Sequence, residues 1–326
     1  MARVAIVLGA GGTVGHAFHA GVLTALADEL GWDPRRADLV VGTSAGSIVA
    51  AMLRAGMPPV DMVRRGSRLP ISPEGEAVVR RAGLGAPRPR PERRRPSGPM
   101  ASPARLRAAV RSPWSVSAGS LAAALLPEGK VPSEDIAVPF DNLYGASWMV
   151  APTWIVAVQL DTGARVAFGR DGAPAATPAE AVRASCAIPA YFEPAEIGGH
   201  RYVDGGVHST TNADLVAAEQ PDLVLVSAPM SAARGAVRLG PATAMRQIAR
   251  LSLAREVSGL RARGIPVVAF QPTATDVALM AGDSLDPRKF APVAASAEQS
   301  TRRRLARSDL RERLSALAEH TTPTAR

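Results

Sequence analysis

The chain has 326 residues, of which 47% are hydrophobic, and a formal net charge of +9. This length allows one large core or two modest ones, and the composition is that of a globular α/β protein. An apolar run of about 18 residues does not occur, which argues against a transmembrane helix. The single cysteine, Cys186, excludes an internal disulfide framework and a thiolate zinc cluster.

The positive charge is concentrated in one stretch of the sequence. Between Arg80 and Arg111 there are ten Arg and one Glu, an excess of nine that equals the net charge of the chain. The rest of the chain is balanced in total, so we expect no basic face spread over the fold. Residues 83–113 are rich in Pro, Arg, Gly and Ser and cannot bury enough apolar surface to order themselves. We expect a disordered or lid-like insertion there.

The N-terminal part alternates apolar strands with helical patterns. In chain order the predicted elements are a strand (Val4–Leu8), a glycine loop (Gly9–Gly15), a helix (His16–Leu30), a second strand (Asp38–Val41), a serine turn and a helix (Ala45–Arg54). Continuous apolar strands separated by helices indicate a mainly parallel sheet covered on both faces. The N-terminal apolar run is too short for a signal peptide, so we expect a cytoplasmic protein.

The later part continues the pattern. We predict a hairpin (Trp154–Leu160 and Arg165–Phe168), a helix (Pro178–Ser185), strands at Leu223–Val226 and Val267–Phe270, and an amphipathic helix around Ala244–Arg263. The sequence thus favours one α/β/α domain over residues 1–313, followed by a disordered tail over residues 314–326.

The glycine loop is compatible with three interpretations. A dinucleotide-binding loop requires G-x-G-x-x-G, but the sixth position counted from Gly9 is Val14. An oxyanion hole requires small residues whose backbone N–H groups face a developing negative charge. A tight strand-to-helix turn with no chemical role is the third interpretation.

The serine turn is more specific. Gly42-Thr43-Ser44-Ala45-Gly46 matches G-x-S-x-G, in which glycines permit a sharp turn that presents the serine hydroxyl. Because the match lies between an apolar strand and a helix, it predicts that Ser44 is a nucleophile.

The base that would activate Ser44 has two candidates. His208 lies four residues after Asp204, so an Asp-His pair could arise from one loop. The alternative is Asp204 itself, whose ordinary pKa of about 3.9 would rise on partial burial among Tyr202, Val203 and Val207. The other histidines are at positions 16, 19, 200 and 320.

These pieces together resemble the patatin-like phospholipase family of acyl hydrolases. Four stretches resemble the family in its own order: LGAGGTVGHAFHAGVLTAL (Leu8–Leu26), VVGTSAGSIVAA (Val40–Ala51), ASCAIPAYFEP (Ala184–Pro194) and YVDGGVHSTTNADL (Tyr202–Leu215). The last includes Asn212, where a family Asn commonly follows the Asp-Gly-Gly motif. The resemblance implies a three-layer α/β/α patatin-like fold.

The resemblance also implies the roles of individual residues. Ser44 would be the nucleophile and Asp204 the general base, in a dyad that needs no histidine, metal or other cofactor. Backbone N–H groups of Gly11 and Gly12 would form the oxyanion hole. The remaining glycines of the motifs would shape the loops: Gly9, Gly15, Gly42, Gly46, Gly205 and Gly206. One departure is Val14, where the family usually carries Arg or Lys.

The implied function is hydrolysis of carboxylic esters in lipids, of the phospholipase A, lysophospholipase or esterase type, through an acyl-enzyme. Two alternatives stay open: a non-catalytic or weakly active lipid- or protein-binding module, and a serine esterase that depends on His208. The Arg80–Arg111 stretch suits peripheral contact with an anionic membrane, at the inner face for a cytoplasmic protein. It equally suits a solvated linker with no partner. It lacks the interleaved aromatic residues that nucleic acid binding favours.

Overall fold

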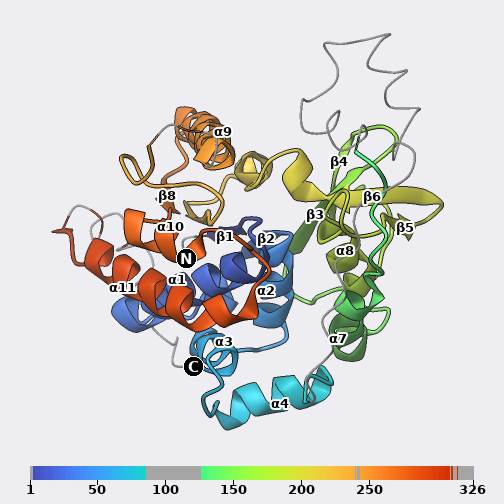
Figure 1. Ribbon diagram of the computed structural model, residues 1–326, viewed down its shortest axis with the longest axis horizontal. Helices are drawn as coiled ribbons and strands as arrows, with labels where there is room; N and C mark the ends of the chain where they lie inside the picture. Colours follow the sequence, from blue (N-terminus) through green and yellow to red (C-terminus); the bar gives the residue numbers. More distant parts are fainter. Residues whose placement is uncertain are drawn as a thin grey trace.

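The computed structural model describes residues 3–85, 126–238, 240, 243–308, 310 and 314. Within these residues eight strands form one sheet in the order β5-β6-β3-β2-β1-β7-β8, with β4 paired to β3 (Figure 1). The strands are β1 (Val4–Leu8), β2 (Leu39–Thr43), β3 (Thr153–Gln159), β4 (Arg165–Phe168), β5 (Ala195–Ile197), β6 (His200–Asp204), β7 (Leu223–Ser227) and β8 (Val267–Phe270).

The centre of the sheet is parallel. β3, β2, β1, β7 and β8 run parallel to their neighbours, whereas β4 and β6 are antiparallel to β3 and β5 is antiparallel to β6. Every residue of β1, β2 and β7 is buried, which explains why their sequences are continuously apolar rather than alternating. The predicted α/β fold with a mainly parallel central sheet is confirmed.

Helices cover both faces of this sheet. The α-helices are α1 (Gly12–Leu30), α2 (Ala45–Arg54), α3 (Pro59–Gly66), α4 (Pro73–Arg81), α7 (Glu134–Tyr144), α8 (Pro178–Ser185), α9 (Ala244–Ala262), α10 (Ala274–Met280) and α11 (Phe290–Leu305). Ile6 and Leu8 of β1 face a core shared with α1, α2 and α11, while Ala5 and Val7 face a second core that includes Leu253 of α9. α9 thus lies on the opposite face from α1, α2 and α11, giving three layers.

One predicted boundary is wrong. The sequence predicted a loop as far as Gly15, but α1 begins at Gly12. Glycine is a poor helix former, so its local preference indicated a loop. The first turn nevertheless closes, because the Gly15 N–H donates to the Gly11 carbonyl (2.9 Å) and the Val14 N–H donates to the Ser284 carbonyl (3.1 Å).

Most of the predicted insertion (83–113) and of the predicted tail (314–326) lies outside the described residues. Their disorder, the domain limits drawn from them and the membrane role of the Arg80–Arg111 stretch therefore stay predictions.

Candidate active site

Ser44 occupies a strained turn between β2 and α2. Its φ is 54° and its ψ −121°, a conformation that side chains rarely adopt and that costs about 1–3 kcal/mol. Gly42 and Gly46 lie so close to other backbone atoms that neither position has room for a side chain. A Cβ on Gly42 would lie 2.6 Å from the Gly46 carbonyl oxygen, and a Cβ on Gly46 would overlap the Leu8 carbonyl. The local sequence therefore fixes the position of the Ser44 side chain at the carboxyl end of β2.

A second serine holds the Ser44 backbone in place. The Ser44 N–H donates to the Ser185 hydroxyl oxygen (2.8 Å), and that hydroxyl donates to the Val156 carbonyl of β3 (2.6 Å). The Ser44 carbonyl accepts from the Ser47 hydroxyl (2.6 Å). Ser185 belongs to the Ala184–Pro194 stretch, but sequence reasoning gave it no role.

Asp204 lies at the end of β6, where the sheet brings it to the serine turn. Its side chain is buried, its N–H donates to the Ala187 carbonyl (2.9 Å), and its Oδ1 accepts from the Gly206 N–H (2.8 Å). Burial raises the pKa of Asp204 to about 6, and hydrogen bonds from the Ser44 side chain and the Gly206 N–H act in the opposite direction. The structure thus brings together Ser44 and Asp204, which are far apart in the sequence.

The glycines after Asp204 allow its loop to pack closely. A Cβ on Gly205 would overlap the Val156 carbonyl, and a Cβ on Gly206 would lie 3.0 Å from Asp204 Oδ1. The same Cβ on Gly206 would lie 3.4 Å from the Cβ of Ala10. The Asp204 loop therefore lies against the glycine loop.

The glycine loop follows β1 at the same edge of the sheet. The Gly9 N–H donates to Ser227 and the Ala10 N–H to Thr210, at 3.0 and 2.7 Å. The N–H groups of Gly11 and Gly12 donate to no acceptor among the described residues. They lie at the start of α1, where N–H groups point out of the helix and favour negative charge.

Two contacts fix this loop beside the serine turn. A Cβ on Gly15 would lie 3.6 Å from the Cβ of Ala45, the residue after Ser44, and 3.3 Å from the Pro229 ring. Val14 is buried in the core and its N–H is bonded to Ser284. The loop is thus held by backbone bonds and packing at the position where the family usually carries a cation.

His19 is hydrogen-bonded to the glycine loop. It is fully buried; its Nε2 lies 2.8 Å from the Gly9 carbonyl oxygen and its Nδ1 lies 2.7 Å from the Ser227 hydroxyl. Burial lowers the pKa of His19 to about 3, so the ring is neutral. Because a carbonyl can only accept, Nε2–H donates to Gly9 and Nδ1 accepts from Ser227.

None of the other described histidines makes a hydrogen bond to Ser44 within the described residues. His16 is half-buried with its ring edge-on to the Phe290 ring, and this desolvation lowers the pKa of His16 to about 4. His208 is exposed, with Arg165 and Asp214 as its charged neighbours, and it makes no hydrogen bond to Ser44 within the described chain. His200 is exposed on β6.

Asn212 links the two loops that carry Ser44 and Asp204. It is fully buried with φ 56°, and its Nδ2 donates to the Thr43 hydroxyl (3.1 Å), to the Gly205 carbonyl (3.4 Å) and to the Ser209 carbonyl (2.7 Å). The bonds to Thr43 and Gly205 tie together the residues adjacent to the candidate dyad.

Glu256 of α9 braces the same loop and was missed by sequence reasoning. Its carboxylate accepts from the hydroxyls of Ser209 and Thr211 and from the N–H of Ala213, the last at 2.8 Å. The pKa of Glu256 is raised, because burial outweighs the opposite effect of these hydrogen bonds.

A mainly apolar cavity of about 480 Å³ is lined by residues of α1, α2, α3, α7 and α11, and Ser44 itself is not among them. His16 and Ile48 line it, together with Met52, Met57 and Met62. This volume is in the range of small-molecule sites, and flexible methionine side chains suit a chain-like apolar ligand.

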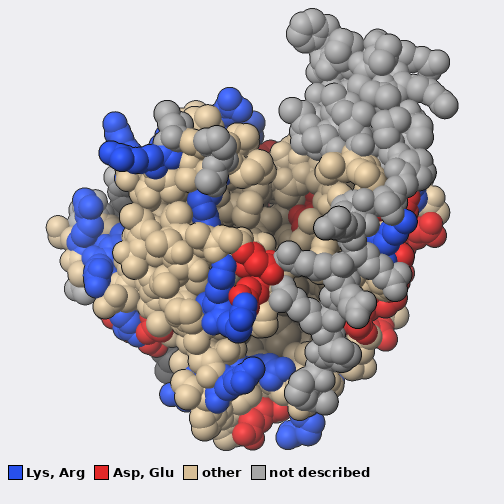
Figure 2. Space-filling view, viewed as in Figure 1, with Lys and Arg blue, Asp and Glu red and all other residues tan. Residues whose placement is uncertain are grey.

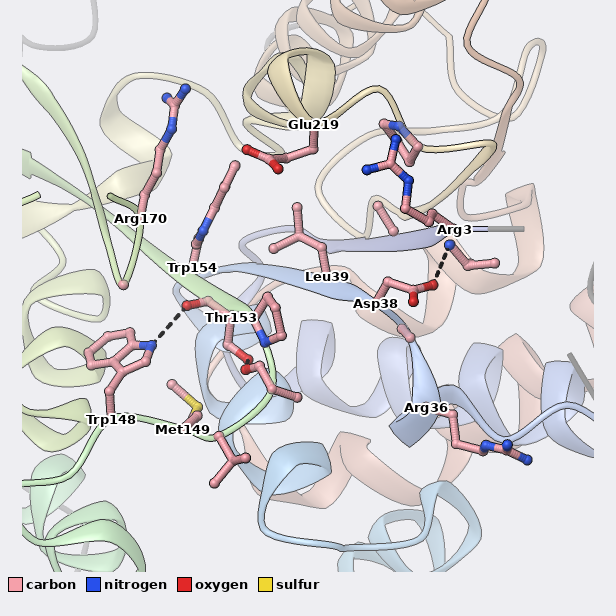
Figure 3. Close-up of a pocket in the computed structure, with 18 of the residues that line it drawn as sticks. Arg3, Arg36, Asp38, Leu39, Trp148, Met149, Thr153, Trp154, Arg170 and Glu219 are labelled. Carbon is pink, nitrogen blue, oxygen red and sulfur yellow. Dashed lines mark hydrogen bonds between the residues drawn. The ribbon is translucent and has the colours of Figure 1, made fainter. Parts of the chain in front are cut away.

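A larger pocket of about 930 Å³ lies at the opposite edge of the sheet, where the parallel strands begin (Figure 3). Two pairs of its polar groups are hydrogen-bonded to each other: the Val4 N–H donates to Asp38 (2.7 Å) and the Trp148 Nε1–H to the Thr153 carbonyl (3.1 Å). It contains none of the predicted site residues.

The described residues contain no cluster of three or more His, Cys, Asp or Glu that could hold a metal ion. None of the described helices has both the length and the hydropathy to cross a membrane.

Comparison with known protein families finds one similarity. The profile of the family described as Patatin-like phospholipase matches residues 6–69 and 151–217. The chain is patatin-like over these two segments. They contain the glycine loop, Ser44, Ser185, Asp204 and Asn212, and the unmatched residues between them include the predicted insertion. This similarity suggests lipid acyl hydrolase activity.

Among solved structures, the crystal structure of VipD from Legionella pneumophila matches with a TM-score of 0.41 and 13% identity, covering 98% of this chain and 67% of that chain. A comparison with curated proteins gave no match.

Proposed function

We propose that this patatin-like protein is a serine acyl hydrolase that cleaves carboxylic ester bonds of lipids, with Ser44 as nucleophile and Asp204 as general base. The observation that carries the proposal is the hydrogen-bonded pair of a strained, buried serine and a buried carboxylate whose pKa is raised to about 6. A pKa near neutrality lets the carboxylate accept a proton far better than an ordinary Asp.

The proposed reaction has two halves. In the first, Asp204 accepts the Ser44 hydroxyl proton while Oγ attacks the ester carbonyl, and the N–H groups of Gly11 and Gly12 stabilise the oxyanion. The tetrahedral intermediate expels the alcohol or lysolipid, which takes the proton from Asp204. In the second half, Asp204 removes a proton from water, which attacks the acyl-Ser44 ester. The tetrahedral intermediate then expels Ser44 Oγ, which takes the proton back from Asp204, and the fatty acid is released.

We assign the acyl chain to the mainly apolar cavity of about 480 Å³. Its lining residue Ile48 lies one helical turn after Ser44, and His16 lies one turn after Gly12. The acyl chain would therefore leave the reacting carbon between the two helix starts that supply the nucleophile and the oxyanion donors.

A fluorophosphonate probe and a water-soluble p-nitrophenyl ester test the dyad. Wild type should label and turn over, and Ser44→Ala should do neither. Asp204→Asn should lower kcat/KM by about 10²–10⁴-fold, the usual contribution of a general base. The acid limb of the pH–rate profile should have an apparent pKa of about 6.

Two controls separate the alternatives. His208→Ala should leave labelling intact, because His208 faces Arg165 and Asp214 and not Ser44; loss of labelling would favour the histidine-dependent esterase. A wild-type protein that neither labels nor hydrolyses any ester, but binds lipid, would favour the non-catalytic module. Deleting residues 83–113 should weaken sedimentation with anionic vesicles if the predicted insertion contacts a membrane.

A further inference from the structure

The first half of α9 carries apolar side chains that face solvent. Met245, Ile248 and Leu251 are 62%, 60% and 52% exposed, and they follow one another at intervals of three residues. Residues at this spacing share one side of a helix, whereas Ala249 and Leu253 of the same helix are buried against the sheet. We call these three side chains the α9 stripe.

The N-terminal end of α9, where the stripe begins, is connected with the candidate active site. α9 follows the carboxyl end of β7, and the Arg246 side chain donates to the carbonyls of Pro229 and Ser231 at 2.8 and 2.9 Å. Pro229 in turn packs on the glycine loop, where it would lie 3.0 Å from a Cβ on Gly11. Two contacts therefore connect the start of α9 with the candidate oxyanion donors.

The surroundings of the stripe are cationic. Residues 223–275 contain seven Arg and one acidic residue, Glu256, whose carboxylate is turned into the Ser209–Ala213 loop. Figure 2 shows a group of Lys and Arg side chains over the α9 end of the molecule. Arg234, Arg238 and Arg255 are exposed there. The balanced total charge outside Arg80–Arg111 is thus compatible with a local group of exposed arginines beside α9.

We propose that the α9 stripe and its arginines dock this protein onto an anionic lipid surface. Apolar side chains rimmed by Arg on an amphipathic helix are the pattern of helices that lie in a membrane interface. Three side chains over two turns are far fewer than the about 20–30 residues per side of a stable protein interface. The charge excess selects anionic over neutral lipid. This inference deepens the proposed function by naming how the protein meets a lipid surface.

Binding is measured on full-length Ser44→Ala protein, so that vesicles are not consumed. Cosedimentation with phosphatidylglycerol/phosphatidylcholine vesicles should show binding that weakens with salt, and phosphatidylcholine alone should bind at least tenfold more weakly. Replacing Met245, Ile248 and Leu251 together by Ser should reduce affinity for the mixed vesicles at least tenfold. Replacing Arg234, Arg238 and Arg255 by Gln should reduce the salt dependence.

A local reporter separates α9 from other cationic segments. Cys186 is the only cysteine and is buried, so Ile248→Cys adds the one accessible thiol for an environment-sensitive dye. Its emission should shift to shorter wavelength on anionic vesicles. Val150→Cys is the matched control, because Val150 is fully exposed at the opposite edge of the sheet, and its dye should not shift.

The outcomes are distinct. No shift at position 248, or equal shifts at both positions, overturns the proposal. A wild-type dimer that the triple Ser variant converts to monomer also overturns it and assigns the stripe to a second copy of the chain. Hydrolysis of the water-soluble ester should be unchanged by the triple variant. If the wild type lacks that activity while the 248 dye still shifts, the docking surface stands and the hydrolase proposal falls.

Discussion

The two edges of the central sheet differ in what their polar groups can do. At the edge where the parallel strands begin, the larger pocket of about 930 Å³ contains charged groups of both signs that pair with neighbours, such as Arg170 over the Trp154 ring. At the edge where the strands end lie a strained serine, a buried carboxylate and two backbone N–H groups that donate to no described acceptor. The cavity of about 480 Å³ approaches them through Ile48, one helical turn after the serine.

This difference follows from the direction of a parallel sheet. Helices begin where parallel strands end, so their unpaired N–H groups collect at one edge, and ligands of α/β sheets bind there. If pocket volume alone identified the functional site, the edge where the parallel strands begin would be chosen. The candidate chemistry is marked instead by positive φ, by burial of a charge and by unused hydrogen-bond donors.

The largest expected effect concerns the stability of the carboxyl edge. Asp204 has its pKa raised from 3.8 to about 6, so the folded state loses stability as pH rises through 6. Asp204→Asn should therefore increase the free energy of unfolding at pH 8 by about 3 kcal/mol, and by less than about 1 kcal/mol at pH 4. Urea denaturation at both pH values measures this.

Asp171→Asn is the control at the other edge, since Asp171 is exposed in the larger pocket and should change stability by less than about 0.5 kcal/mol. If Asp204→Asn is less stable than wild type at pH 8, burial of the ionised Asp204 carboxylate does not destabilise the folded state.

The strained turn gives the second prediction. Ser44→Gly should be more stable than Ser44→Ala by about 1–3 kcal/mol, because glycine adopts φ 54°, ψ −121° without steric conflict. Both variants lack the hydroxyl, so their difference in thermal or urea denaturation reports the backbone alone. Equal stabilities would mean that the turn is not strained.

The cavity lined by Ile48 gives the third prediction. Ile48→Trp should fill part of it and lower kcat/KM for p-nitrophenyl dodecanoate about tenfold relative to the butyrate. This corresponds to lost burial of about two methylenes at about 0.8 kcal/mol each. Val150→Trp places the same ring in the pocket of the opposite edge and should leave the ratio unchanged. If Val150→Trp lowered the ratio and Ile48→Trp did not, the acyl-chain site would be assigned to the larger pocket instead.

The smallest expected effect concerns the link between the two loops. Asn212→Gly keeps a residue that adopts φ 56° but removes the bonds to Thr43 and Gly205. We expect kcat for the soluble ester to fall about fivefold, about 1 kcal/mol. The control is Asn142→Ala on α7, which removes a bond to the Ala82 carbonyl at the end of α4, outside both loops. Similar effects on kcat would show that Asn212 acts only through general stability.

The sequence predicted the elements in which local and global preferences agree. The buried strand Val4–Leu8, the serine turn and the helix Ala45–Arg54 are visible because apolar runs, glycines and a G-x-S-x-G pattern coincide there. The start of α1 was wrong because Gly12 and Gly15 serve close packing, which helix propensity does not describe.

The role of Glu256 and the exposure of the α9 stripe could not be predicted from the sequence, for a different reason. A buried Glu256 in an amphipathic helix has the same sequence signature as a surface Glu, and only its bonds to Ser209, Thr211 and Ala213 distinguish it. The exposure of Met245, Ile248 and Leu251 depends on which side of α9 meets the sheet, and their spacing alone would also fit a buried face.

The bond from Ser44 to Ser185 spans 141 residues of sequence, and β1 has its second neighbour, β7, only at Leu223–Ser227. During synthesis from the N-terminus, the ribosome therefore releases the serine turn long before its supports at Ser185, Asp204 and Asn212 exist. A nascent or prematurely terminated chain ending before residue 204 contains the proposed nucleophile without its proposed base. Biosynthetic order alone thus keeps the proposed lipid-cleaving machinery unassembled until about two thirds of the chain has been made.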